Sequence, residues 1–239
     1  MAFPPGAALA WILHRTLDLS AGFPLWVLAV YASTGLLILF TRPARFPGPG
    51  MGAANRVTLL RIVVALPLAG FALEASVVDP SVRWWVVALG TVALVLDGVD
   101  GWVARRTGSG TEFGARFDME TDALLLLVLS VLAWRSGQVG PWVLGIGAMR
   151  YLFVAAGAAV AKLRRPLPPS MRRKVVCVIQ GIALLICLGP IVPVGLALAA
   201  AGTALASLVA SFALDTWWLL TASESDQASA AGASVTRAA

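Results

Sequence analysis

The sequence predicts an all-α, polytopic integral membrane helix bundle with six core transmembrane helices and one extra amino-terminal span. Of its 239 residues, 59% are hydrophobic and only 13% are charged, with a mean hydropathy of +0.86. Soluble domains carry about a quarter charged residues, and disordered chains are poor in hydrophobic ones. The sequence also contains several uncharged stretches close to the roughly 20 residues that a helix needs to cross a bilayer.

These stretches set the order of the spans. Residues 24–40 predict the first, and the Pro, Gly and Arg residues of 41–56 predict a loop or interfacial segment. From 175 to 214 the chain has 40 consecutive uncharged residues, too many for one span, and Gly189, Pro190 and Pro193 divide them into two. The remaining spans are predicted at about 57–75, 82–104, 112–134 and 140–161.

Three regions follow from this order. We expect the extra span and its linker in 1–52, the membrane domain in 53–220, and a disordered tail rich in Ala and Ser in 221–239. If the loop at 41–56 faces the cytosol, 13 of the 18 basic residues lie on that side, three lie outside and two lie within spans. The positive-inside rule favours this orientation, with the amino terminus outside. The prediction is a multi-pass protein of the cell membrane.

The acidic residues gather in one segment: six of the 12 lie between positions 97 and 122. Asp97 and Asp100 share one face of a helix, and Asp118 and Asp122 share a face of the next. The short turn at 107–111 makes these helices antiparallel. At about 1.5 Å of rise per residue, both pairs lie roughly 9 to 15 Å from the turn, so they are expected to meet at the same depth.

Four carboxylates at one depth repel each other unless cations lie between them. The segment 97–122 contains no His or Cys, so oxygen ligands favour two divalent ions, Mg²⁺ or Mn²⁺, over zinc. A two-metal site suits phosphoryl transfer. Small residues in the same segment would let a ligand approach the backbone, and the guanidinium of Arg105 could bind a diphosphate.

The pattern D-x2-D-G-x2-A-R-x8-G-x3-D-x3-D, met at every fixed position from Asp97 to Asp122, resembles the signature of the CDP-alcohol phosphotransferases. The stretch from Asn55 to Arg61 also resembles the first core helix of this family. The resemblance implies a transferase of phospholipid biosynthesis in which an alcohol attacks the phosphorus next to the lipid of CDP-diacylglycerol, or of a similar CDP-alcohol, and expels CMP. It also implies a homodimer.

The resemblance further implies a role for each motif residue. Asp97, Asp100 and Asp118 would bind metals. Asp122 would contact metal and act as the general base on the acceptor hydroxyl. The donor nucleotide would lie against Gly101, Ala104, Arg105, Gly114 and Thr58.

Basic residues near the predicted cytosolic side have two interpretations. They orient the protein and attract anionic membrane lipids, or some of them bind a phosphate of the acceptor or lipid. The candidates for phosphate are Arg61, Arg116, Arg150, Arg173 and Lys174. A purely structural alternative for the aspartates is ion pairing within the membrane, with Arg105, Arg116 or Arg150 as partners.

Two other functions stay open at this point. An intramembrane prenyltransferase also binds a diphosphate through aspartates and Mg²⁺, and a cation transporter could carry ions on the same carboxylates. The acceptor alcohol is not determined: glycerol phosphate, phosphatidylglycerol, inositol phosphate and serine all fit. No nucleic-acid partner is expected.

Overall fold

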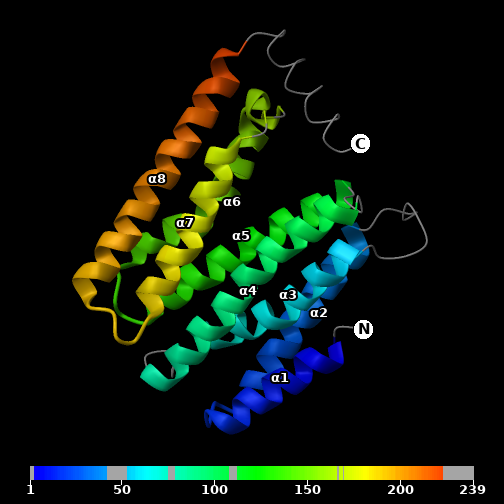
Figure 1. The fold of residues 1–239 in the computed structure, drawn as a ribbon, viewed down its shortest axis with the longest axis vertical. Coiled ribbons are helices and arrows are strands. Elements are labelled where there is room, and N and C mark those ends of the chain that lie inside the picture. The colour runs from blue at the N-terminus through cyan, green and yellow to red at the C-terminus, as the bar shows by residue number, and fades with distance from the viewer. Residues whose placement is uncertain are drawn as a thin grey trace.

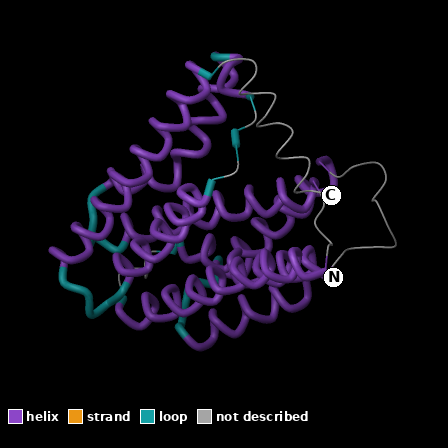
Figure 2. Tube along the Cα trace, turned by 45° about the horizontal axis from the view of Figure 1, so that its top comes forward, coloured by secondary structure: helices purple, strands orange, loops and turns teal. Residues whose placement is uncertain are grey.

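The computed structural model describes residues 3–41, 53–74, 79–107, 112–165, 167–168 and 170–222, without the side chains of 3–4, 35–41, 53–59, 100–107, 112–113 and 115–117. This part of the chain is helical and contains no strand (Figure 2). Its eight α-helices are α1 (Phe3–Thr16), α2 (Phe23–Thr41), α3 (Ala53–Phe71), α4 (Pro80–Thr107), α5 (Glu112–Arg135), α6 (Leu144–Ala159), α7 (Met171–Leu188) and α8 (Val194–Thr221). Two 3₁₀ turns, η2 (Pro141–Val143) and η3 (Ala161–Arg164), flank α6.

The helices lie side by side, with α1 and α2 on one side of the bundle and α8 on the opposite side (Figure 1). Successive helices pack in pairs, α3 with α4, α5 with α6 and α7 with α8. Helices α3 and α7 each pack against both α4 and α5. The two helices that carry the acidic motif are therefore flanked by α3 and α7.

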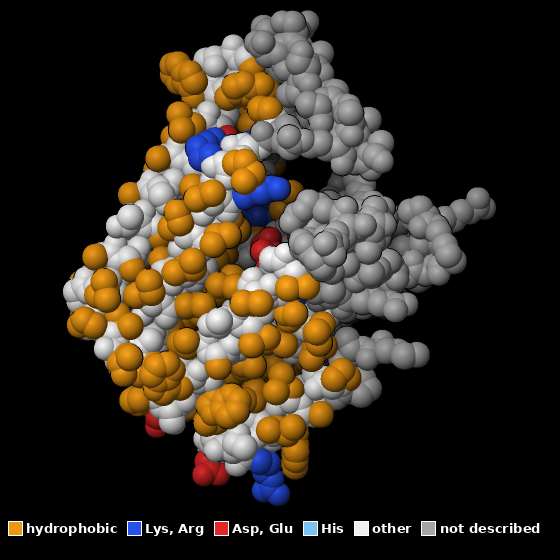
Figure 3. Space-filling view, viewed as in Figure 1, with side chains coloured by type: hydrophobic (Ala, Val, Ile, Leu, Met, Phe, Trp, Pro, Cys, Tyr) orange, Lys and Arg blue, Asp and Glu red, His pale blue; other side chains and the backbone are white. Residues whose placement is uncertain are grey.

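Three described helical segments are long and apolar enough to cross a membrane: Pro80–Val99, Pro141–Ala159 and Val194–Thr221. Shorter apolar helices cover Phe23–Thr34 and Leu60–Phe71. Figure 3 shows hydrophobic side chains over most of one face. Charged groups lie at the lower end of this face and in its upper half. These features indicate a membrane protein, whereas the total of seven spans stays a prediction.

The amino-terminal region differs from the expectation of one extra span. Helix α1 precedes α2 and packs against α2 and α3, with Ala10 and Leu13 completely buried. Its 14 residues are too few to cross a bilayer, so hydropathy gave no sign of it. Helix α1 runs antiparallel to α2 (Figure 1), and α2 corresponds to the predicted extra span at 24–40. The region thus contains one helix more than was expected, while the single span and the outer position of the amino terminus stay predictions.

Tyr31 joins the first three helices. Its hydroxyl donates a hydrogen bond of 2.7 Å to the carbonyl of Val63 on α3. That carbonyl lies four residues before Pro67, which has no N–H to continue the helical ladder. On α1, a Cβ at Gly6 would overlap the Tyr31 ring, so glycine is needed for the ring to fit.

Arginines bind the carbonyls that helices leave unpaired where they end. Arg83 is buried and donates to the carbonyls of Leu188 and Gly189 after α7, at 3.1 and 3.0 Å. Arg135 donates to the carbonyl of Ala72 after α3. The bundle thus accommodates charge at these ends without opening its apolar core.

Candidate active site

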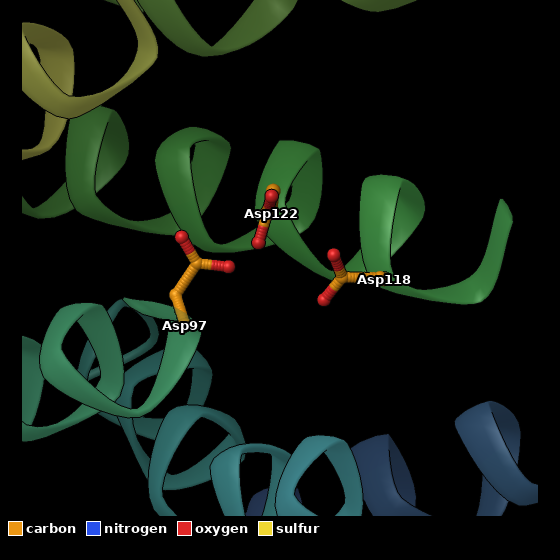
Figure 4. Close-up of side chains that lie close together, drawn as sticks. All are labelled: Asp97, Asp118 and Asp122. Atoms are coloured by element: carbon orange, nitrogen blue, oxygen red, sulfur yellow. The ribbon is translucent and has the colours of Figure 1, made fainter. Parts of the chain in front are cut away.

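Asp97 on α4 and Asp118 and Asp122 on α5 come together in the structure (Figure 4). One carboxylate oxygen from each lies within 4.8 Å of the others. Asp118 and Asp122 are one helical turn apart and therefore share a face of α5. We call these three residues the aspartate cluster. Three of the four aspartates that were expected at one depth are thus close together, and the side chain of Asp100 lies outside the described residues.

The aspartate cluster lies beside α3, which packs against both α4 and α5. Arg61 on α3 is completely buried, and its guanidinium contacts all three members of the cluster. Nη1 donates to Asp97, while Nη2 lies 2.5 Å from Oδ1 of Asp118 and 3.2 Å from Oδ1 of Asp122. Arg61 was predicted as a phosphate ligand, and in this structure it is a partner of the carboxylates.

The ion pairs that the sequence suggested for the aspartates involved Arg105, Arg116 or Arg150 and did not include Arg61. Arg150 pairs with Glu120, which lies on α5 but outside the aspartate cluster. The side chains of Arg105 and Arg116 lie outside the described residues.

The donor set fits a hard divalent cation. The cluster offers carboxylate oxygens alone, the ligands that Mg²⁺ and Mn²⁺ prefer. The buried guanidinium of Arg61 against the same carboxylates shows that the site is arranged around positive charge. The side chains of Asp97, Asp118 and Asp122 are each partly exposed.

A cavity of about 190 Å³ lies beside the cluster, between α5, α6, α7 and α8. Asp122 lines this cavity and also belongs to the cluster. Most of the remaining wall is apolar, with Leu126, Ile146 and Phe212 among its residues. Further polar side chains on the wall are Arg150, Arg173, Gln180, Ser211 and Asp215.

The basic side chains of this wall already have acidic partners. Arg173 lies 3.1 Å from Oδ1 of Asp215, and Arg172 shares the same oxygen at 2.5 Å. Of the predicted phosphate ligands, Arg150 and Arg173 line the cavity. Lys174 is exposed and is not among the lining residues.

The predicted metal ligand Asp100 has its side chain outside the described residues, and so do most of the predicted nucleotide-binding residues: Gly101, Ala104, Arg105 and Thr58. Two glycines of the motif can be placed. Gly114 lies on α5 one turn before Asp118. A Cβ at Gly98, next to Asp97, would meet no described atom within 4 Å, so the backbone of α4 is open there.

Several residues of the cavity were not predicted, among them the buried polar residues Gln180 and Asp215. Gln180 is completely buried and donates from Nε2 to the carbonyl of Ala204 at 3.0 Å, whereas its Oε1 has no hydrogen-bond partner among the described residues. Asp215 is also buried and holds the two arginines. Their signal in the sequence was polarity: Gln180 lies within the 40 uncharged residues, and Asp215 is the acid that ends them. Polar groups at such positions commonly mark function.

A family model of the CDP-alcohol phosphatidyltransferases matches residues 51–218. The chain belongs to this family. Membership supports a transferase that moves a phosphate-linked group from a CDP-alcohol to an alcohol acceptor, and members typically depend on divalent metal ions. The motif resemblance is thereby confirmed. No solved structure matches the chain.

Proposed function

We propose that this phosphatidyltransferase-family protein transfers a phosphatidyl, or other substituted phosphate, group from CDP-diacylglycerol or a similar CDP-alcohol to an alcohol and releases CMP. The observation that carries the proposal is the double position of Asp122. It belongs to the aspartate cluster and lines the adjoining cavity. An alcohol in the cavity can therefore reach a carboxylate that is also next to the phosphate-binding site.

The donor would bind at the cluster end. Asp97, Asp100, Asp118 and Asp122 would hold two divalent ions, which supply charge neutralisation of the diphosphate and stabilise the attacking and leaving oxygens. The open backbone at Gly98 leaves room for a ligand beside α4. The nucleotide would lie against Gly101, Ala104, Arg105, Gly114 and Thr58, as the family motif implies.

The acceptor would enter through the cavity. Asp122 accepts the proton of its hydroxyl, the alcohol oxygen forms a bond to the phosphorus next to the lipid, and the bond from that phosphorus to CMP breaks. The apolar residues of the cavity wall exclude water, which would otherwise compete as the nucleophile. Asp122 is thus both a metal ligand and the general base in this proposal.

The cavity also bears on the class of acceptor. Arg150 and Arg173 line it, and each is paired with a carboxylate that an incoming phosphate would replace. This arrangement favours an acceptor that carries a phosphate. In the same proposal the protein is a homodimer in the cell membrane, and Asp122 faces the cytosol.

The test uses purified protein in detergent with CDP-diacylglycerol, Mg²⁺ and a panel of acceptor alcohols. We expect CMP and one new lipid, identified by mass spectrometry. Asp122→Asn should reduce CMP release by about 10²- to 10⁴-fold, the usual contribution of a general base. Asp79→Asn is the matched control and should retain activity, because Asp79 lies just before the first residue of α4, at the end of the helix away from Asp97.

Three results would refute the proposal. Retained activity in both Asp118→Asn and Asp122→Asn would show that these carboxylates do not have the assigned roles in the reaction. Release of pyrophosphate instead of CMP would indicate a prenyltransferase. Metal flux in sealed vesicles without dependence on nucleotide would indicate a transporter.

A further inference from the structure

Within the part of the chain that the structure describes, Arg61 brings positive charge to the aspartate cluster. Its guanidinium is completely buried and contacts Asp97, Asp118 and Asp122 through both terminal nitrogens. Arg61 comes from α3, whereas the carboxylates come from α4 and α5. One side chain therefore joins three helices at the residues assigned to metal binding.

We infer that Arg61 is the internal counter-ion of the metal-free protein, which holds the cluster together and competes with divalent ions for its carboxylates. This positioning role differs from the phosphate-binding role that the sequence predicted. It rests on the metal-binding part of the proposed function.

Without a cation, the aspartate cluster is unstable. Carboxylate oxygens within 4.8 Å of one another repel strongly where water is scarce. A buried guanidinium, in turn, requires acidic partners. Arg61 and the aspartates satisfy both requirements together, so removing the arginine should separate the acidic helices when no metal is bound.

Charge balance points the same way. In the proposed function two divalent ions lie among the three aspartates of the cluster and Asp100, and their four positive charges equal the charge of four ionised carboxylates. The positive charge of Arg61 would then be in excess at the cluster. Divalent ions must therefore bind against its repulsion and weaken its ion pairs. A neutral residue at position 61 removes this competition.

The experiment measures Mn²⁺ binding by electron paramagnetic resonance and thermal unfolding, both in detergent, and needs no substrate. For Arg61→Gln, purified with Mn²⁺ present, we expect Mn²⁺ affinity to increase by at least about tenfold, which corresponds to 1.4 kcal/mol. Its unfolding temperature should fall in chelator and return close to the wild-type value with Mn²⁺. Arg61→Lys keeps the charge but not the two-nitrogen fork, and should bind Mn²⁺ with intermediate affinity.

Arg83→Gln is the matched control. Like Arg61, Arg83 is a buried arginine, but it donates to the backbone carbonyls of Leu188 and Gly189 and not to the aspartate cluster. This variant should lower the unfolding temperature equally with and without Mn²⁺ and leave Mn²⁺ affinity unchanged.

The outcomes separate this inference from the proposed function. Equal or weaker Mn²⁺ binding by Arg61→Gln, with normal binding by the wild type, would overturn the role of Arg61 alone. Failure to obtain either Arg61 variant even with Mn²⁺ would also overturn it, because Arg61 would then be required in the metal-loaded protein. If the wild type binds no divalent ion, the metal site itself is refuted.

Discussion

Replacing Gly147 with alanine tests how closely α5 and α6 must approach to form the cavity. A Cβ at Gly147 would overlap the Cα of Leu127 and would lie 2.8 Å from the backbone nitrogen of Leu127 and 2.9 Å from the carbonyl oxygen of Leu126. These are backbone atoms of α5 and cannot rotate away. Ordinary contacts begin at 3.4 Å and the overlap with the Cα is the closest, so α6 must move from α5 by about 1 Å.

Two losses should follow from this displacement. Overpacking of a tight interface costs about 1 to 3 kcal/mol of stability. Activity should fall further, because α5 carries Asp122 and α6 carries Arg150, which line the same cavity. A misplacement of about 1 Å can reduce a rate by roughly 10²-fold, so we expect a reduction of about tenfold or more.

The assays are thermal unfolding in detergent and CMP release at saturating donor. Gly202→Ala is the control, since a Cβ there meets no described atom within 4 Å, and it should stabilise α8 by about 0.5 to 1 kcal/mol with unchanged activity. If Gly147→Ala matched Gly202→Ala in both assays, the close approach of α5 and α6 would have no role in stability or catalysis.

Three further substitutions give separate tests. Tyr31→Phe leaves the buried carbonyl of Val63 without the hydroxyl donor and should destabilise the protein by about 1 to 3 kcal/mol, measured by thermal unfolding. Hydrogen bonds from the side chain and backbone of Ser81 lower the pKa of Asp79 below 3.8. The stability that this carboxylate provides is therefore present above pH 3.8 and is lost as the pH falls through its folded-state pKa. Asp79→Asn should reduce this loss of stability at low pH, measured by unfolding at a series of pH values. Arg173→Gln should raise KM for a phosphate-bearing acceptor by about tenfold with little change in KM for the donor, and an equal change in both constants would argue against a phosphate subsite.

The motif on α4 and α5 was predictable because helical period and turn length are local properties. The spacing of Asp118 and Asp122 places both on one face, and the short connection after Thr107 brings Asp97 toward them. The contact of Arg61 with these residues was not predictable in the same way. It depends on α3 packing against both α4 and α5, a tertiary relation that no spacing within the chain encodes.

The cavity and α1 could not be predicted from the sequence for the same reason, because both depend on how the helices pack against one another. Gln180 and Asp215 stand out as polar residues in apolar surroundings, but the sequence does not show that they line one wall with Asp122. Helix α1 has too few residues for a span, and its apolar residues Ala10 and Leu13 become informative only when α2 and α3 lie against them. The hydropathy criterion detects only apolar stretches long enough to span a membrane, so it did not detect α1.

The most direct test of the central claim is CMP release from CDP-diacylglycerol by the wild-type protein as Mg²⁺ is titrated into a chelated sample, with the acceptor identified by the panel above. We expect no release in chelator and recovery with Mg²⁺ or Mn²⁺, whereas Asp122→Asn should stay at least about 10²-fold below the wild type at every metal concentration. CMP release that persists undiminished in chelator would contradict a metal-dependent role for the aspartate cluster.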